Sequence, residues 1–154
     1  MRRPLLVVVL FALVGCAHAA PSDSTASIAS VTIHGSQGPV RVQVEDANSP
    51  AERERGLMGR TSLGANEGMV FTFGDVADGP VTATFWMKDT LIPLSIAFWS
   101  ADGTILAIRD MEPCRTDTCS TYGSPSPYVG ALEVNRGFFE EHGIREGDRI
   151  DVAR

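Results

Sequence analysis

The feature that most constrains the fold is the stretch at residues 85–99, where two apolar runs flank a polar island at residues 88–90. Runs that are rich in aromatic and β-branched residues and bounded by turn residues are typical of buried strands. Proline cannot donate a hydrogen bond to a neighbouring strand, so Pro93 should open the second strand. We therefore expect a central pair of strands at residues 82–87 and 94–99. The charged island should stay at the surface or in a cleft, because unpaired charge is costly to bury.

Short apolar or alternating runs, separated by turns that contain Gly and Pro, recur along the rest of the chain. The 154 residues include 15 Gly and nine Pro, a composition that favours many turns and short elements. Beyond the central pair, we expect strands at residues 31–33, 40–45, 68–73, 104–111, 128–134 and 149–152. A mainly β chain of about seven or eight short strands most easily forms a small closed or partly open β-barrel, which leaves few sheet edges.

Two short helices should interrupt the strands. Ser49 can cap a helix at residues 50–55, which has proline at its first position and Glu52 in place to complete a capping box. Asn135 can cap a second helix at residues 136–142, which a glycine follows. The sequence therefore predicts a mainly β, α+β fold.

The first residues have the pattern of an export signal. Residues 1–15 contain two arginines and then an apolar run at residues 5–14, which fits a signal peptide. The run covers only about half of the roughly 30 Å hydrocarbon core, so it is too short to span a bilayer. The four residues that end at Cys16 resemble the lipobox of bacterial lipoproteins. That resemblance implies lipidation of Cys16, whose acyl chains would anchor the protein in the lipid bilayer.

The segment after the leader lacks apolar periodicity. Residues 16–30 are rich in Ala, Ser and Thr and would form a lipid-anchored flexible tether to a single globular domain at residues 31–154. The anchored protein would face the periplasm or the extracellular side of the membrane. The alternative is ordinary cleavage after Ala19, which would release a soluble periplasmic protein.

The cysteine count agrees with export. Either maturation route removes Cys16 from the thiol pool, which leaves Cys114 and Cys119 as an even pair. We expect these two to form a disulfide. A zinc site would need two further ligands, and only His34 and His142 are available, far apart in the sequence. A redox dithiol usually has the spacing Cys-x-x-Cys, which is absent here.

The charge balance excludes one class of partner. The chain has 13 Lys and Arg residues against 19 Asp and Glu residues, for a formal net charge of −6. An acidic surface repels phosphate backbones, so we expect no nucleic acid partner.

Three sequence blocks and a following Gly-Asp turn carry a resemblance to a known family; they lie at residues 53–60, 85–94, 132–139 and 143–148. They resemble the domain of unknown function 192, a family of small bacterial and archaeal proteins that are often exported. The family usually has Asn where Asp89 stands and Asp where Ser95 stands. The resemblance implies a compact, mainly β fold with short helices, and it implies no established activity.

Several polar residues are candidates for a ligand site. Three cations lie beside turns and would form a pocket for a carboxylate, phosphate or sulfate if they converged: Arg55, Arg60 and Lys88. Three further polar residues complete the candidate set: Asp89, Glu133 and Asn135. The alternative is that the cations pair with neighbouring acids such as Glu52, Asp89 and Glu133.

Catalysis is the rival hypothesis. Lys88, Asp89 and Glu133 could supply general acid–base chemistry if burial shifted their pKa values. The chain has no Ser-His-Asp order, nucleophile elbow or phosphate loop. These absences favour a protein that is not an enzyme, with an envelope hydrolase or transferase as the alternative.

Other side chains have both a functional and a structural interpretation. Four methionines could bind copper, but they form no clustered motif and more often fill gaps in a core: Met58, Met69, Met87 and Met111. We therefore expect no metal and no cofactor. Trp86 and Trp99 could stack on a sugar ring, but their apolar neighbours favour packing in the core.

These observations predict an uncharacterised cell-envelope protein, a non-catalytic lipid-anchored module that binds a small polar or anionic ligand or a partner protein. In the partner-protein case, Tyr122, Tyr128 and the long loop at residues 112–127 would supply the contact surface.

Overall fold

The computed structural model describes residues 27–73 and 79–153. The predicted signal peptide and Cys16 lie outside the described residues. The strands are β1 (Ser27–Gly35), β2 (Gly38–Ala47), β3 (Glu67–Thr72), β4 (Phe85–Trp86), β5 (Leu94–Trp99), β6 (Ile105–Met111), β7 (Thr121–Tyr122), β8 (Gly130–Asn135) and β9 (Arg149–Ala153). The helices are α1 (Pro50–Arg55) and α2 (Phe138–Glu141). The strand β1 therefore begins within the segment predicted as a tether.

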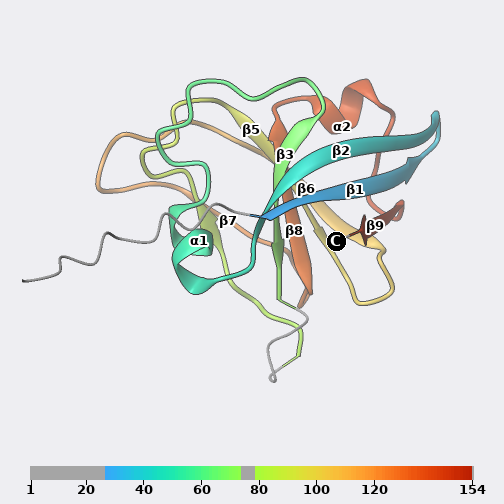
Figure 1. The fold of residues 1–154 in the computed structure, drawn as a ribbon. Coiled ribbons are helices and arrows are strands. Elements are labelled where there is room, and N and C mark those ends of the chain that lie inside the picture. Colours follow the sequence, from blue (N-terminus) through green and yellow to red (C-terminus); the bar gives the residue numbers. More distant parts are fainter. Residues whose placement is uncertain (1–26, 74–78, 154) are drawn as a thin grey trace, which may run out of the picture.

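Seven strands form one strongly curled sheet in the order β6-β5-β8-β3-β2-β1-β9 (Figure 1). The β2–β3 pair is parallel, and the other neighbours are antiparallel. The curl brings the two edge strands together, because Thr104 forms an isolated bridge with Arg149 and Ile150 N–H donates to the Gly103 carbonyl at 2.8 Å. The predicted mainly β, partly open barrel with two short helices is confirmed.

The sheet is covered on both faces. One core has members on all seven strands and on α2, so it fills the inside of the curl. The second core lies on the outer face of β3, β8, β5 and β6 and is closed by the residues that follow α1 and by Met87. Every residue of β5 is buried, which explains why its sequence is a continuous apolar run rather than an alternating one.

The predicted central pair of strands is wrong. Residues 82–84 are exposed, and β4 is only two residues long. It pairs with β7 outside the main sheet, while β5 pairs with β6 and β8. The polar island and Pro93 separate the two runs, and the chain uses this interval to cross from the outer face into the sheet. Phe85 and Met87 then pack onto the outer core instead of joining the seven-stranded sheet.

The first helix forms as predicted. Ser49 accepts a hydrogen bond from the backbone N–H of Glu52, and the Glu52 carboxylate accepts one from the Ser49 N–H. This capping box satisfies free backbone groups at a helix too short to be stable alone.

The second helix begins later than predicted, and Asn135 does not cap it. Asn135 remains in β8, opposite Leu94, and its amide donates to the Leu63 and Gly64 carbonyls. The helix α2 begins after Gly137, which adopts a left-handed conformation (φ 82°). The Gly137 N–H donates to the Ser95 hydroxyl at 3.0 Å, which ties the start of α2 to β5.

The predicted disulfide between Cys114 and Cys119 is present. It closes part of the long loop between β6 and β7. No helix in the described ranges combines the length and apolar character needed to cross a bilayer.

Candidate functional site

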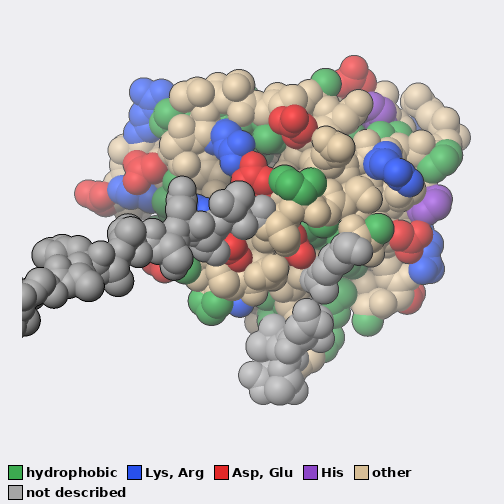
Figure 2. Space-filling view, in the orientation of Figure 1, with side chains coloured by type: hydrophobic (Ala, Val, Ile, Leu, Met, Phe, Trp, Pro, Cys, Tyr) green, Lys and Arg blue, Asp and Glu red, His purple; other side chains and the backbone are tan. Residues whose placement is uncertain are grey.

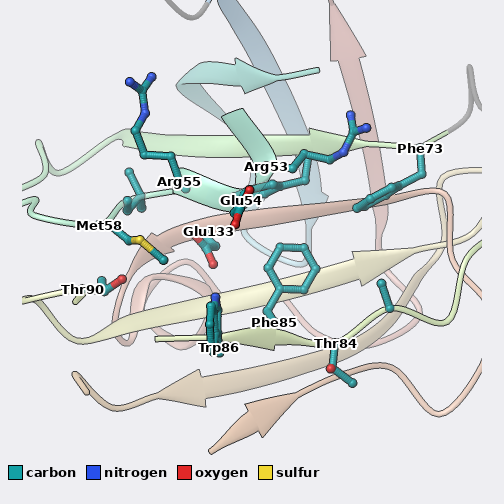
Figure 3. Close-up of a pocket in the computed structure, with 14 residues that line it drawn as sticks. Arg53, Glu54, Arg55, Met58, Phe73, Thr84, Phe85, Trp86, Thr90 and Glu133 are labelled. Carbon is teal, nitrogen blue, oxygen red and sulfur yellow. The ribbon is translucent and has the colours of Figure 1, made fainter. Parts of the chain in front are cut away.

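A cavity of about 270 Å³ lies between α1, the end of β3, β4 and β8 (Figure 3). Acidic and basic side chains are interspersed over the face of the molecule seen in Figure 2. The lining of the cavity combines one buried carboxyl, four aromatic rings and the polar residues of α1. Such a concave, mostly apolar site with few polar groups is the usual form of a small-molecule pocket.

Glu133 is the buried carboxyl of this cavity. In β8 it lies opposite Met69 of β3 and Ile96 of β5, so both of its cross-strand neighbours are apolar. The residue is 4% exposed, and its carboxyl makes no hydrogen bond with any residue in the described ranges. Burial raises the pKa of Glu133 to about 8. Figure 3 shows the carboxyl directed into the cavity.

Aromatic rings form the walls. Phe71, Phe73, Phe85 and Trp86 line the cavity, and the Phe71 and Phe85 rings meet edge to face with centroids 4.9 Å apart. Trp86 is 50% exposed, so the prediction of a core position is wrong for this residue. Trp99 is 5% exposed and belongs to the inner core, as predicted.

The helix α1 supplies the charged rim. The Arg53 guanidinium lies 5.5 Å from the centroid of the Phe73 ring and donates to the Asn48 carbonyl at 2.5 Å. The Arg55 side chain is exposed, and its guanidinium makes no hydrogen bond or ion pair with the part of the chain that the structure describes. Met58 and Thr90 also line the cavity and lie on the same side of the view as Arg55 in Figure 3.

Of the six predicted ligand residues, Arg55 and Glu133 line the cavity. Arg60 instead pairs with Glu45 at 2.5 Å, and Lys88 pairs with Asp117 at 2.7 Å. The hydrogen bond to Asp117 raises the pKa of Lys88 and so keeps the amine protonated. The three cations therefore do not converge on one pocket.

Asp89 and Asn135 form hydrogen bonds with backbone groups of neighbouring loops. Asp89 is exposed, with a left-handed backbone (φ 53°) that Asp and Asn tolerate better than most residues. Its N–H donates to the Cys114 carbonyl, and its carbonyl accepts from the Gly59 N–H. Asn135 braces the loop that precedes β3, as described above. Of the predicted acid–base trio, Glu133 alone lines the cavity.

The four methionines considered as copper ligands do not share one site. Met58 lines the cavity, and the other three are buried in the outer core: Met69, Met87 and Met111. Within the described ranges, no three His, Cys, Asp or Glu side chains are grouped as a metal site would require. Tyr128 is fully buried, so it cannot supply an exposed contact surface for a partner protein.

Sequence reasoning missed the aromatic walls and Arg53. The walls come from β3 and β4, whose proximity depends on the long crossover and not on any local motif. One signal was available: Glu133 is an acidic residue inside an otherwise apolar strand, and an acid in that position is rarely fully buried without a partner.

Comparison with known proteins agrees with the fold. A crystal structure of a protein of unknown function from Novosphingobium aromaticivorans DSM 12444 is 34% identical, with a TM-score of 0.75 over 86% of this chain and 91% of that chain. A crystal structure of a proposed transcription regulator from Sinorhizobium meliloti 1021 is 31% identical, with a TM-score of 0.74 over 83% of this chain and 95% of that chain. No curated protein matches at a significant level. The model of the DUF192 family, described as "Uncharacterized ACR", matches residues 30–152, and the chain belongs to this family.

Proposed function

We propose that this protein is a non-catalytic binding module that holds a small polar ligand in the cavity between α1, β4 and β8. The observation that carries the proposal is the Glu133 side chain, which is 4% exposed, lines the cavity and makes no hydrogen bond in the described ranges. Its carboxyl is therefore open to a group in the cavity. A ligand that donates a hydrogen bond to Glu133 would pair this carboxyl.

The size and lining of the cavity limit the ligand. A volume of about 270 Å³ is slightly below the usual range of small-molecule sites, so the ligand is smaller than a typical drug. The rings of Phe85 and Trp86 suit its apolar part. Arg55 stands unpaired among the described residues at the rim and can meet an anionic group at the outer end of the ligand.

The proposal includes export and lipid anchoring through Cys16. The leader at residues 1–15 and the lipobox-like ending support it, and the disulfide suits an oxidising compartment. In cells grown with a labelled fatty acid, the unaltered chain should become labelled and sediment with membranes. Cys16→Ser should lose both properties, and retention of the label by this variant would contradict the anchor.

A thermal-shift screen tests ligand binding. The purified protein, with its disulfide intact, would be mixed with small amines, amides, alcohols, sugars and carboxylates. A ligand at 100 times its Kd adds about 2.7 kcal/mol, which raises Tm by several degrees. We expect the shift to be lost in Trp86→Ala and kept in Ile28→Ala. Among the residues that the structure describes, Ile28 is the other large exposed apolar side chain, and it is far from the cavity in sequence. An equal shift in both variants would place the ligand elsewhere, and no shift with any compound would favour a partner protein.

A second candidate function is an envelope hydrolase or transferase that uses Glu133 as its general acid or base. The observation that favours it is a pKa of about 8, close to the value that suits proton transfer at neutral pH. Lys88 and Asp89 would not take part directly, because neither lines the cavity. If a bound compound is also converted, Glu133→Gln should abolish turnover while a measurable share of binding survives.

A further inference from the structure

We infer that the cavity selects a small monoamine whose ammonium group pairs with the Glu133 carboxylate, an inference that rests on the proposed binding function. The geometry that points to it is a buried, unpaired carboxyl at the base of a cavity with aromatic walls.

No cation among the described residues forms an ion pair with Glu133. Its cross-strand neighbours, Met69 and Ile96, are apolar. The charged groups that line the cavity with it all come from α1, and they are Arg53, Glu54 and Arg55. Arg53 is engaged at Asn48 and Phe73, and Arg55 is exposed to solvent at the rim. Neither arginine pairs with Glu133, so a cationic ligand can supply the counter-charge for an ionised Glu133.

The aromatic walls favour the same kind of group. A cation within about 6 Å of a ring centroid is attracted to the ring face, and Trp gives the strongest attraction. Phe85 and Trp86 offer such rings in the lining. The protein already places one cation in this way, since the Arg53 guanidinium lies 5.5 Å from the centroid of Phe73. An inner ammonium group would gain from the carboxylate and from the rings together.

The rim limits the rest of the ligand. Arg53 and Arg55 carry two positive charges and Glu54 one negative charge, so the rim is positive overall and would repel a second cation at the outer end of the ligand. A neutral tail is tolerated, and an anionic tail would be attracted by Arg55. We therefore expect monoamines to bind better than diamines.

Proton release provides a signature of this pairing. The pKa of Glu133 is about 8, so its carboxyl is mostly protonated at pH 7. It must lose this proton when an ammonium group pairs with it. Binding at pH 7 should release about 0.9 proton per ligand. The association constant should rise about tenfold per pH unit between pH 6 and pH 7 and level off above pH 8.

Four probes of equal carbon number separate the possibilities: n-butylammonium, 4-aminobutyrate, 1,4-diaminobutane and butan-1-ol. Binding to the full chain would be measured by isothermal titration calorimetry at pH 6, 7 and 8, in two buffers that differ in ionisation enthalpy. We expect n-butylammonium and 4-aminobutyrate to bind at least about tenfold more tightly than the diamine or the alcohol.

Two matched variants complete the test. Glu133→Gln keeps the size of the side chain but cannot ionise, and it should weaken n-butylammonium binding at least about tenfold and abolish proton release. Glu141→Gln makes the same change at an exposed position on α2 and should leave both unchanged. Proton release by the unaltered protein tests the same point even if a variant folds poorly.

The contrary outcomes are distinct. If butan-1-ol binds as well as n-butylammonium, or if binding releases no proton, the ammonium inference is overturned and the binding function stands. If n-butylammonium does not bind at about 10 mM, the inference also fails. The wider thermal-shift panel then decides whether the binding function fails with it.

Discussion

Glu133 should make the stability of this protein fall steeply as pH rises. Its pKa is about 8 in the folded protein and 4.5 as a reference value for the unfolded chain. The folded state therefore holds the proton more tightly. Its stabilising effect is fully present below pH 4.5 and is lost as pH rises toward 8. Replacing Glu133 with Gln should remove this dependence.

The size of the effect follows from the shift in pKa. Each pKa unit corresponds to about 1.4 kcal/mol, so ionisation of Glu133 costs the folded state about 5 kcal/mol above pH 8. At pH 7, the free energy of unfolding should be about 3 kcal/mol lower than it is below pH 4.5. Because small domains have unfolding free energies of about 5–15 kcal/mol, either value is large enough to measure.

Guanidinium unfolding, followed by tryptophan fluorescence between pH 5 and pH 9, tests this expectation. The stability of Glu133→Gln minus that of the unaltered protein should increase by several kcal/mol across this range. A constant offset from the new amide does not matter, because the pH dependence alone is compared. Glu141→Gln should follow the unaltered protein. If the difference between Glu133→Gln and the unaltered protein stays constant within about 0.5 kcal/mol, Glu133 is not buried as described.

Three further predictions concern the framework of the site. Reducing the Cys114–Cys119 disulfide should lower the unfolding free energy by about 2 kcal/mol, measured with and without a reductant. Ala at Gly130 would place its Cβ 2.1 Å from the Trp99 ring, so Gly130→Ala should destabilise the protein by about 1–3 kcal/mol and lower Tm. Ser49→Ala should cost about 1 kcal/mol in denaturant unfolding by removing the cap of α1, and Ser49→Asp should restore most of it.

Locally encoded parts of the fold could be predicted from the sequence. The capping box of α1 needs only residues three positions apart, so its chemistry is visible in the sequence. The turn between β5 and β6 is likewise set by adjacent residues around Gly103. The disulfide could be predicted because the expected export would leave only one possible cysteine pair.

Parts that depend on distant contacts could not be predicted. Asn135 has the chemistry of a helix cap, but it donates to carbonyls 71 and 72 residues away. The run at residues 82–87 has the composition of a strand, yet β4 finds its partner in the loop pinned by the disulfide. In both cases a local pattern suits two roles, and only the tertiary arrangement decides between them.

The same limit applies to the site. Glu133 and Arg55 could be predicted as site residues from the sequence. Glu133 is an acid inside an apolar strand, and Arg55 is a cation beside a turn. The expected convergence of Arg60 and Lys88 with Arg55 depended on spatial neighbours that the sequence does not show. Glu45 and Asp117 lie 15 and 29 residues away from their partners and draw these two cations out of the cavity.

The loop that contains the disulfide holds part of the cavity wall in place, so the shape of the cavity should depend on whether the disulfide is oxidised. Lys88 forms an isolated backbone β-bridge with Cys114, and the Asp89 N–H donates to the Cys114 carbonyl. These bonds hold the segment between Trp86 and Thr90, both of which line the cavity. The Asp89 carbonyl also accepts from the Gly59 N–H, so the same segment braces the loop after α1. Reduction should therefore weaken ligand binding as well as stability, and the proposed site depends on the oxidising environment that the leader predicts.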